Sequence, residues 1–281
     1  MQSNTNIASN MEKIGTLFQD AQKYANTNTD FDLLIVHLDY IDSEFQSIAF
    51  EGASMELGLK SFILNDDMQS WDEYMNSNPK HQTQIFLGLG WAVSMNKQIP
   101  EYYLNQQNIY LQSKVWDGCG YFDGYFRKRQ TLQSKQRVDY VTSINYQSYD
   151  HGLGRRIWYH VEGDINKASE IINGFPADRH SSLWRGIGMA ATYVGGCGEE
   201  TYKSLSEASK EYKNQLAIGA ATIAHSRSRA NLLTLETETA YNLWCNKTAQ
   251  QAAEIVHSIE IKNPSSFAEF LLQLESNICN Q

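Results

Sequence analysis

The sequence is poor in proline and cysteine. Only 4 of its 281 residues are proline and only 4 are cysteine. Because proline breaks helices and sheet ladders, its scarcity favours long uninterrupted elements. The cysteines form no Cys-x-x-Cys pair, so we expect reduced thiols rather than a disulfide framework. They are Cys119, Cys197, Cys245 and Cys279.

Long apolar runs are also missing. The most apolar stretches, such as GLGWAV and GIGMAATYV, are far shorter than the ~20 residues of a membrane-spanning helix. The N-terminus, MQSNTNIASN, has no apolar signal core. From these two absences we expect a cytoplasmic protein that does not cross a membrane.

The chain lacks an excess of positive charge. Its 23 Lys and Arg residues are outnumbered by 32 Asp and Glu residues, which gives a formal net charge of -9. Binding to a phosphate backbone requires a basic surface. We therefore expect no nucleic-acid partner, and an anionic membrane surface is excluded for the same reason.

Complete catalytic and metal-binding motifs are absent from the sequence. The seven histidines form no His-Glu-x-x-His motif, and no Cys/His cluster has zinc spacing. No phosphate-binding P-loop is present, and the Gly-x-Gly segments lack the preceding strand of a dinucleotide-binding fingerprint. We therefore expect no metal and no cofactor.

What the sequence does contain is a recurring pattern: a bulky residue, then Gly-x-Gly or a degenerate form of it, then further apolar or aromatic residues. It appears as FEGASM, FLGLGW, WDGCGYF, DHGLGRRIW, WRGIGMA and LAIGAAT. The second small residue of each copy serves as an anchor, and successive anchors are 36, 30, 34, 34 and 31 residues apart. The anchors are Ser54, Gly90, Gly120, Gly154, Gly188 and Gly219.

This spacing predicts helix pairs. A period of about 34 residues is that of tetratricopeptide helix–turn–helix repeats. Glycine is also a turn residue, but apolar residues continue at helical spacing on both sides of each pair, which favours helix. We predict an all-α, tetratricopeptide-like α-solenoid of about six helix-pair repeats. It would form a single domain over residues 1–281, with core repeats at about 31–260 and residues 1–10 disordered.

Glycine in the interior of these helices is energetically unfavourable. An interior glycine costs about 1 kcal/mol relative to alanine, so packing must compensate for each one. A missing side chain lets a neighbouring backbone come close. The pattern therefore predicts that Gly154 and Gly188 are in tight contact with an adjacent helix.

The same register predicts a site. In tetratricopeptide-style arrays, positions 2, 5, 9 and 12 of the first helix line the concave face, and each anchor above is position 8. Charged and aromatic side chains then converge in one groove, which is a binding-site hypothesis. The predicted binding residues are Glu51, Trp91, Asp117, Tyr121, His151, Arg155, Trp158 and Arg185.

Two interpretations of this groove remain open. The charges could bind an anionic or carbonyl-bearing ligand, with Glu51, Asp117 and His151 as candidates for acid–base catalysis. Alternatively, arginines and carboxylates could pair with one another and join adjacent repeats. The substitution Asp117→Asn separates these interpretations, because it would lower stability in the second case and binding in the first.

Several motifs resemble a known family. The segments Phe50–Gly52, Gly88–Ala92, Asp117–Tyr121, Asp150–Trp158 and Leu183–Gly196 follow, in order, the pattern of the UnbL-like family. That bacterial family is a domain of unknown function found with enediyne polyketide biosynthesis clusters. The resemblance covers roughly residues 45–225 and implies a role in natural-product biosynthesis, but no particular reaction. His151 and Cys119 occupy variable positions of that pattern.

Three functions are consistent with these observations. The first is an accessory protein of natural-product biosynthesis that binds a partner protein or a polyketide intermediate in the groove. The second is a tailoring enzyme that uses acid–base residues there, and the third is a general protein–protein interaction module. A closed pocket with unpaired carboxylates would favour the second function, and an open channel with exposed aromatics the first. The sequence does not define an oligomeric state.

Overall fold

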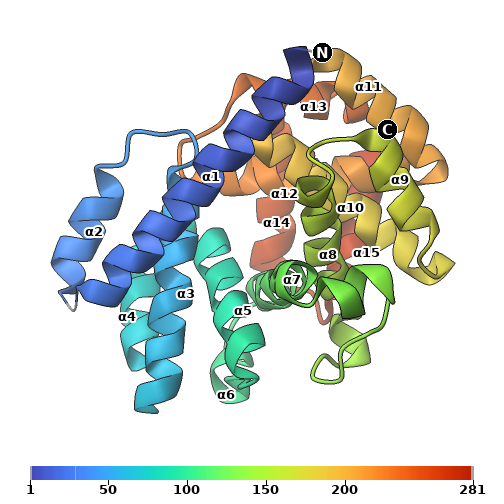
Figure 1. Ribbon diagram of the computed structural model, residues 1–281. Coiled ribbons are helices and arrows are strands. Elements are labelled where there is room, and N and C mark those ends of the chain that lie inside the picture. The colour runs from blue at the N-terminus through green and yellow to red at the C-terminus, as the bar shows by residue number, and fades with distance from the viewer. Residues whose placement is uncertain (1, 29, 280–281) are drawn as a thin grey trace.

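The computed structural model describes residues 2–28 and 30–279, which form fifteen α-helices and no strand (Figure 1). The all-α prediction is therefore confirmed for the described part of the chain. Residues 2–10, for which the sequence predicted disorder, form the first turns of α1 (Gln2–Thr27). Ile7 and Ile14 anchor this helix in the hydrophobic core.

Six helices carry the repeated glycine pattern, and each packs against the next one along the chain. They are α3 (Gln46–Leu64), α5 (Gln82–Asn96), α7 (Ile109–Phe126), α8 (Tyr146–His160), α10 (Ala177–Val194) and α12 (Lys213–Arg229). We refer to these six as the glycine helices.

The remaining helices precede, connect or follow the glycine helices. Besides α1, the α-helices among them are α2 (Phe31–Asp39), α4 (Gln69–Ser77), α6 (Glu101–Leu104), α9 (Ile165–Asn173), α11 (Gly198–Ser209), α13 (Leu235–Cys245), α14 (Ala249–Lys262) and α15 (Phe267–Cys279). Short 3-10 or π segments are η1 (Pro79–His81), η2 (Arg129–Gln133), η3 (Ser143–Asn145) and η4 (Lys210–Tyr212).

The Gly-x-Gly spacing explains how one helix packs against two neighbours. Two residues span about 200° around a helix, so the two glycines of a pair face roughly opposite sides. On α7, a Cβ on Gly118 would overlap the carbonyl oxygen of Leu87 on α5, and one on Gly120 would overlap that of Tyr149 on α8. The predicted tight contacts of Gly154 and Gly188 are also confirmed, against Leu183 and Leu216.

The row of glycine helices closes on itself. Ser226 at the end of α12 donates a hydrogen bond to Gln84 on α5, over 2.8 Å, and Arg229 bonds to Gln82 in the same helix. Residues about 150 positions apart in the sequence thus meet at one seam.

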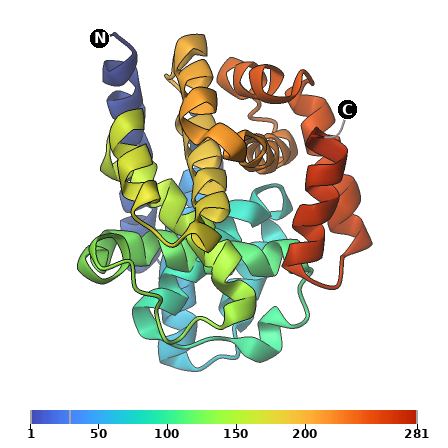
Figure 2. The ribbon, with the colours of Figure 1, turned by 90° about the vertical axis from the view of Figure 1, so that its right-hand side faces the viewer.

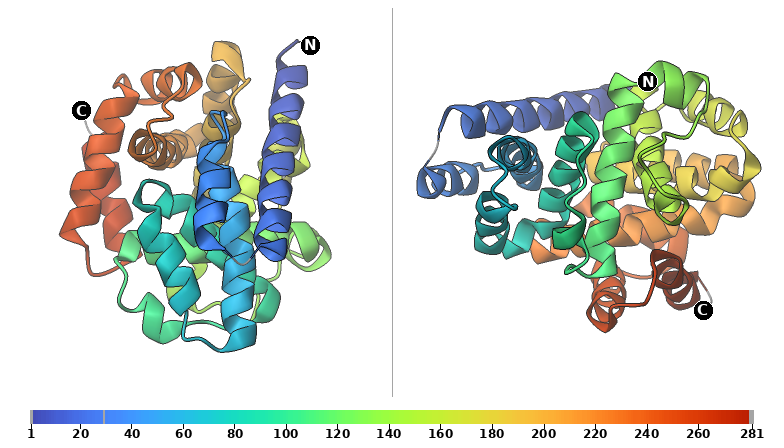
Figure 3. Two further views of the ribbon diagram at one scale, coloured as in Figure 1. Left: turned by 90° about the vertical axis from the view of Figure 1, so that its left-hand side faces the viewer. Right: turned by 90° about the horizontal axis from the view of Figure 1, so that it is seen from below.

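Helix α1 lies on the opposite side of the molecule from α14 and α15 (Figures 2 and 3). It runs against α3 and also contacts α10, so it covers the inner side of the glycine helices. Among the described residues, no helix combines the length and apolar character needed to cross a membrane.

Candidate functional site

A cavity of about 480 Å³ lies between α1 and the inner faces of the six glycine helices. This volume is within the range of small-molecule sites in proteins. The angular spacing that directs the glycines toward neighbouring helices also determines which side chains of the same helices point into this cavity. Residues two positions before or after the centre of a Gly-x-Gly point away from that centre, and for Glu51, Trp91, Tyr121 and Arg155 this direction leads into the cavity.

Aromatic rings form one wall of the cavity. Phe18 of α1 lies 4.6 Å from Trp91 of α5, measured between ring centroids, and Trp91 lies 5.4 Å from Tyr121 of α7. Tyr121 in turn contacts Tyr159 of α8 at 5.5 Å. This series of four rings crosses four helices and gives the cavity an elongated apolar surface.

A charged cluster lies beside these rings. The carboxylate of Glu51 accepts a hydrogen bond from the Trp91 indole, over 3.2 Å. Arg155 donates from Nε to Oδ1 of Asp117, over 2.8 Å, and its guanidinium lies 5.0 Å from the centre of the Tyr121 ring. Both carboxylates are buried, with 2% of Glu51 and 1% of Asp117 exposed. We call Glu51, Lys114, Asp117 and Arg155 the cavity cluster.

Hydrogen bonding in the cavity cluster is incomplete. Oε2 of Glu51, Oδ2 of Asp117 and the second terminal nitrogen of Arg155 have no hydrogen-bond partner among the described residues. The ammonium of Lys114 lies over the Tyr110 ring, 4.6 Å from its centre, in a side chain that is only 2% exposed. Buried polar groups are nearly always hydrogen-bonded in native proteins. Three buried polar atoms without hydrogen-bond partners, grouped at one cavity, therefore indicate a candidate ligand site.

Burial also changes the proton affinity of this cluster. Desolvation raises the pKa of Glu51 from 4.5 to about 7, opposed by the nearby charge of Arg155 and assisted by that of Asp117. Desolvation lowers the pKa of Lys114 to about 8, and the neighbouring Asp117 opposes that change. Glu51 therefore exchanges its proton near neutral pH, which is where a general acid or base works best.

The structure brings together four of the eight predicted binding residues on the cavity wall: Glu51, Trp91, Tyr121 and Arg155. Asp117 joins them through its ion pair with Arg155.

His151 and Arg185 do not line this cavity. They contact each other, with 2.7 Å between Nη1 of Arg185 and Nε2 of His151, and Arg185 also binds Gln215. The His151 ring packs against Phe267 of α15. Burial and the adjacent Arg185 hold the pKa of His151 well below its usual value, so the ring is neutral.

Trp158 also lies away from the cavity, and its side chain is fully buried. Two other residues at register position 12, Ser94 and Gly124, face the following helix instead of the cavity. Ser94 donates to Asp123 on α7, and Gly124 lies against Arg156 on α8. The concave positions of a tetratricopeptide repeat therefore do not transfer in full to these helices.

Two parts of the cavity wall were missing from the sequence prediction. Ile48, Gln84 and Lys114 stand six residues before their anchors, at register position 2, so the same register could have identified them. The α1 residues, Phe18 among them, belong to no repeat. Only the apolar spacing within α1 could have pointed to that helix.

The fold and the cavity together define an all-helical protein with a cavity between α1 and the glycine helices. The chain belongs to the family described as Protein of unknown function (DUF1702), whose sequence model matches residues 1–271. No curated protein and no solved structure matches the chain.

Proposed function

We propose that this protein binds an elongated, mostly apolar small molecule that carries a carbonyl or carboxylate group. The observation that supports this most directly is the set of unpaired buried polar atoms in the cavity cluster, next to an aromatic wall. Arg155 and Lys114 supply donors for an oxygen-bearing group, and protonated Glu51 supplies another. Phe18, Trp91, Tyr121 and Tyr159 provide an apolar surface for the rest of the ligand.

The resemblance of the glycine motifs to the UnbL-like family gives this proposal a setting. We propose that the ligand is an intermediate of enediyne-type polyketide biosynthesis and that the protein acts there as an accessory protein. The glycine helices would then be a tetratricopeptide-like array adapted to enclose a small molecule. The placement of α1 over the inner faces favours a small ligand over a partner protein, because a protein segment would need an open groove.

A tailoring enzyme is the second candidate. The observation in its favour is the pKa of Glu51, raised to about 7 by burial, at a carboxyl group with one unpaired oxygen. Such a group can remove a proton next to a carbonyl or return one. In that case Glu51→Gln would retain ligand binding and abolish turnover of a bound polyketide.

The binding proposal can be tested with cis-parinaric acid, a conjugated polyene carboxylic acid. Titration of this probe should quench the fluorescence of Trp91, and Trp91→Phe should remove most of the quenching. Arg155→Gln should weaken binding at least about tenfold, because a hydrogen bond to a charged group contributes about 1.5–3 kcal/mol. The matched control is Arg137→Gln, which changes an arginine paired with the exposed Asp178.

The control variant should bind the probe like the wild type. If Arg155→Gln binds equally well, or if quenching persists unchanged in Trp91→Phe, the cavity is not the binding site and the proposal fails.

A further inference from the structure

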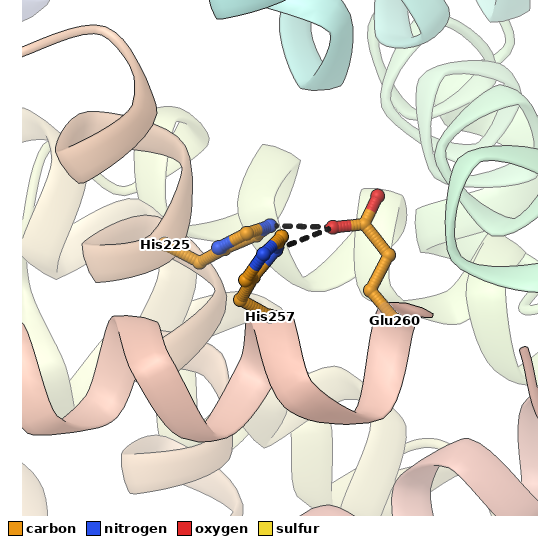
Figure 4. Close-up of side chains that lie close together, drawn as sticks. All are labelled: His225, His257 and Glu260. Atoms are coloured by element: carbon orange, nitrogen blue, oxygen red, sulfur yellow. Dashed lines mark hydrogen bonds and ion pairs between the residues drawn. The ribbon is translucent and has the colours of Figure 1, made fainter. Parts of the chain in front are cut away.

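Three potential metal ligands meet outside the cavity, at the packing of α14 on α12. His225 comes from α12, whereas His257 and Glu260 stand one helical turn apart on α14 (Figure 4). Nε2 of His225 lies 2.9 Å from Oε2 of Glu260, and Nδ1 of His257 lies 3.8 Å from the same oxygen. None of the three lines the cavity described above.

These distances fit a coordination site. The ligand atoms of the three residues all lie within 4.8 Å of one another. Zinc bonds of about 2.0–2.2 Å in tetrahedral geometry place ligand atoms about 3.3 Å apart, so only a small adjustment is needed. His257 can make this adjustment because its side chain is 60% exposed. His225 and Glu260 are buried and held in place.

The neighbours of Glu260 orient it for this role. Its other oxygen, Oε1, accepts from Asn108 at 3.3 Å and from Arg229 at 3.4 Å, which leaves Oε2 directed at the two histidines. Such partners behind a ligating carboxylate are a regular feature of metal sites. Arg229 is itself bound by the carbonyl of Pro79 and the side chain of Gln82, so it need not leave when a cation arrives.

We propose that His225, His257 and Glu260 form a binding site for a divalent transition metal of the zinc class, with water as the fourth ligand. Two imidazoles and one carboxylate are a ligand set that zinc accepts. The positive charge of Arg229 opposes a second cation, so we expect micromolar rather than subnanomolar affinity. The ion would join α12 to α14 at the point where Asn108, at the start of α7, also reaches Glu260. This proposal is independent of what the cavity binds.

The experiment is calorimetric titration of Zn²⁺ into chelator-treated, full-length protein. We expect one equivalent to bind to the wild type and His257→Ala to weaken binding by at least about tenfold. Because His257 is exposed, its replacement should leave the fold intact, which circular dichroism can verify. The matched control is His160→Ala, a half-buried histidine at the end of α8, which should bind Zn²⁺ like the wild type.

A second measurement separates a built site from loose surface binding. Saturating Zn²⁺ should raise the thermal unfolding midpoint of the wild type and of His160→Ala, but not that of His257→Ala. The proposal is overturned if Zn²⁺ shows no saturable binding at tens of micromolar. It is equally overturned if His257→Ala binds like the wild type, or if both histidine variants lose affinity to the same extent.

Discussion

Helix α7 carries two buried aspartates, six residues apart, whose surroundings differ sharply. Asp123 faces an outer cluster, where its Oδ1 accepts from Ser94 and Arg127 and its Oδ2 from the hydroxyls of Tyr140 and Tyr149. Asp117 instead joins a cavity-lining residue, because its Oδ1 accepts from Arg155, and its Oδ2 has no partner among the described residues.

The two carboxylates differ in hydrogen bonding: both oxygens of Asp123 have protein donors, whereas one oxygen of Asp117 can still accept a hydrogen bond from a ligand. A fully bonded buried carboxylate recovers much of its lost hydration from protein donors. An incompletely bonded one leaves part of that cost uncompensated, and a natural site usually retains such an atom for a reason. By this criterion Asp123 joins α5, α7 and α8, whereas Asp117 is a candidate residue of the proposed binding site.

The largest effect on stability should come from Asp123→Asn. Four donors would then face an amide that is neutral and offers one acceptor oxygen. We expect the free energy of unfolding in urea to fall by about 3 kcal/mol. Asp178→Asn, which changes an exposed aspartate, should have almost no effect. A loss below about 1 kcal/mol for Asp123→Asn would contradict the structural role.

The next effect concerns Glu51 and pH. Its pKa is about 7 in the folded protein against an ordinary 4.5, so the folded state binds more protons between these values. Stability should therefore decrease as pH rises from about 5 to 8, by about 2.5 kcal/mol from this group. Glu51→Gln should remove this component and be more stable than the wild type at pH 8.

The measurement is the difference in unfolding free energy between Glu51→Gln and the wild type at several pH values. Glu199→Gln, an exposed control, should follow the wild type throughout. If the difference between Glu51→Gln and the wild type is constant with pH, Glu51 does not titrate as described.

The smallest change in stability is expected for Asp117→Asn, at about 1 kcal/mol or less. The charge of Asp117 opposes ionisation of Glu51, so its removal lets Glu51 ionise and balance Arg155. Binding of cis-parinaric acid should nevertheless weaken about tenfold, because the position of Arg155 depends on Asp117. A loss of stability as large as that of Asp123→Asn, with unchanged probe affinity, would show that Asp117 has the same structural role as Asp123.

Local geometry explains which parts of this molecule could be predicted from sequence. The Gly-x-Gly spacing determines which sides of a helix approach its neighbours, so the helical glycines and the inward positions of Glu51, Trp91, Tyr121 and Arg155 follow from it. Lys114 follows from the same register, at position 2, although it is not among the predicted binding residues.

Long-range contacts explain what could not be predicted. The seam between α12 and α5, and the course of α1 over the cavity, depend on residues far apart in the chain that follow no common pattern. His257 and Glu260 are visible as a pair on one helix. Only the fold adds His225, which stands 32 positions earlier than His257.

The glycine contacts determine which parts of the cavity can change by mutation. Where Gly118 meets Leu87, or Gly152 meets Asp117, one main chain touches another and no side chain sets the spacing. The frame of the cavity is therefore fixed independently of the residues that face inward. Those residues can be exchanged one at a time for others of similar volume while the helices stay where they are. Variants of this chain with other inward-facing residues would thus accept ligands of new shape and polarity while the packing of the helices stays the same.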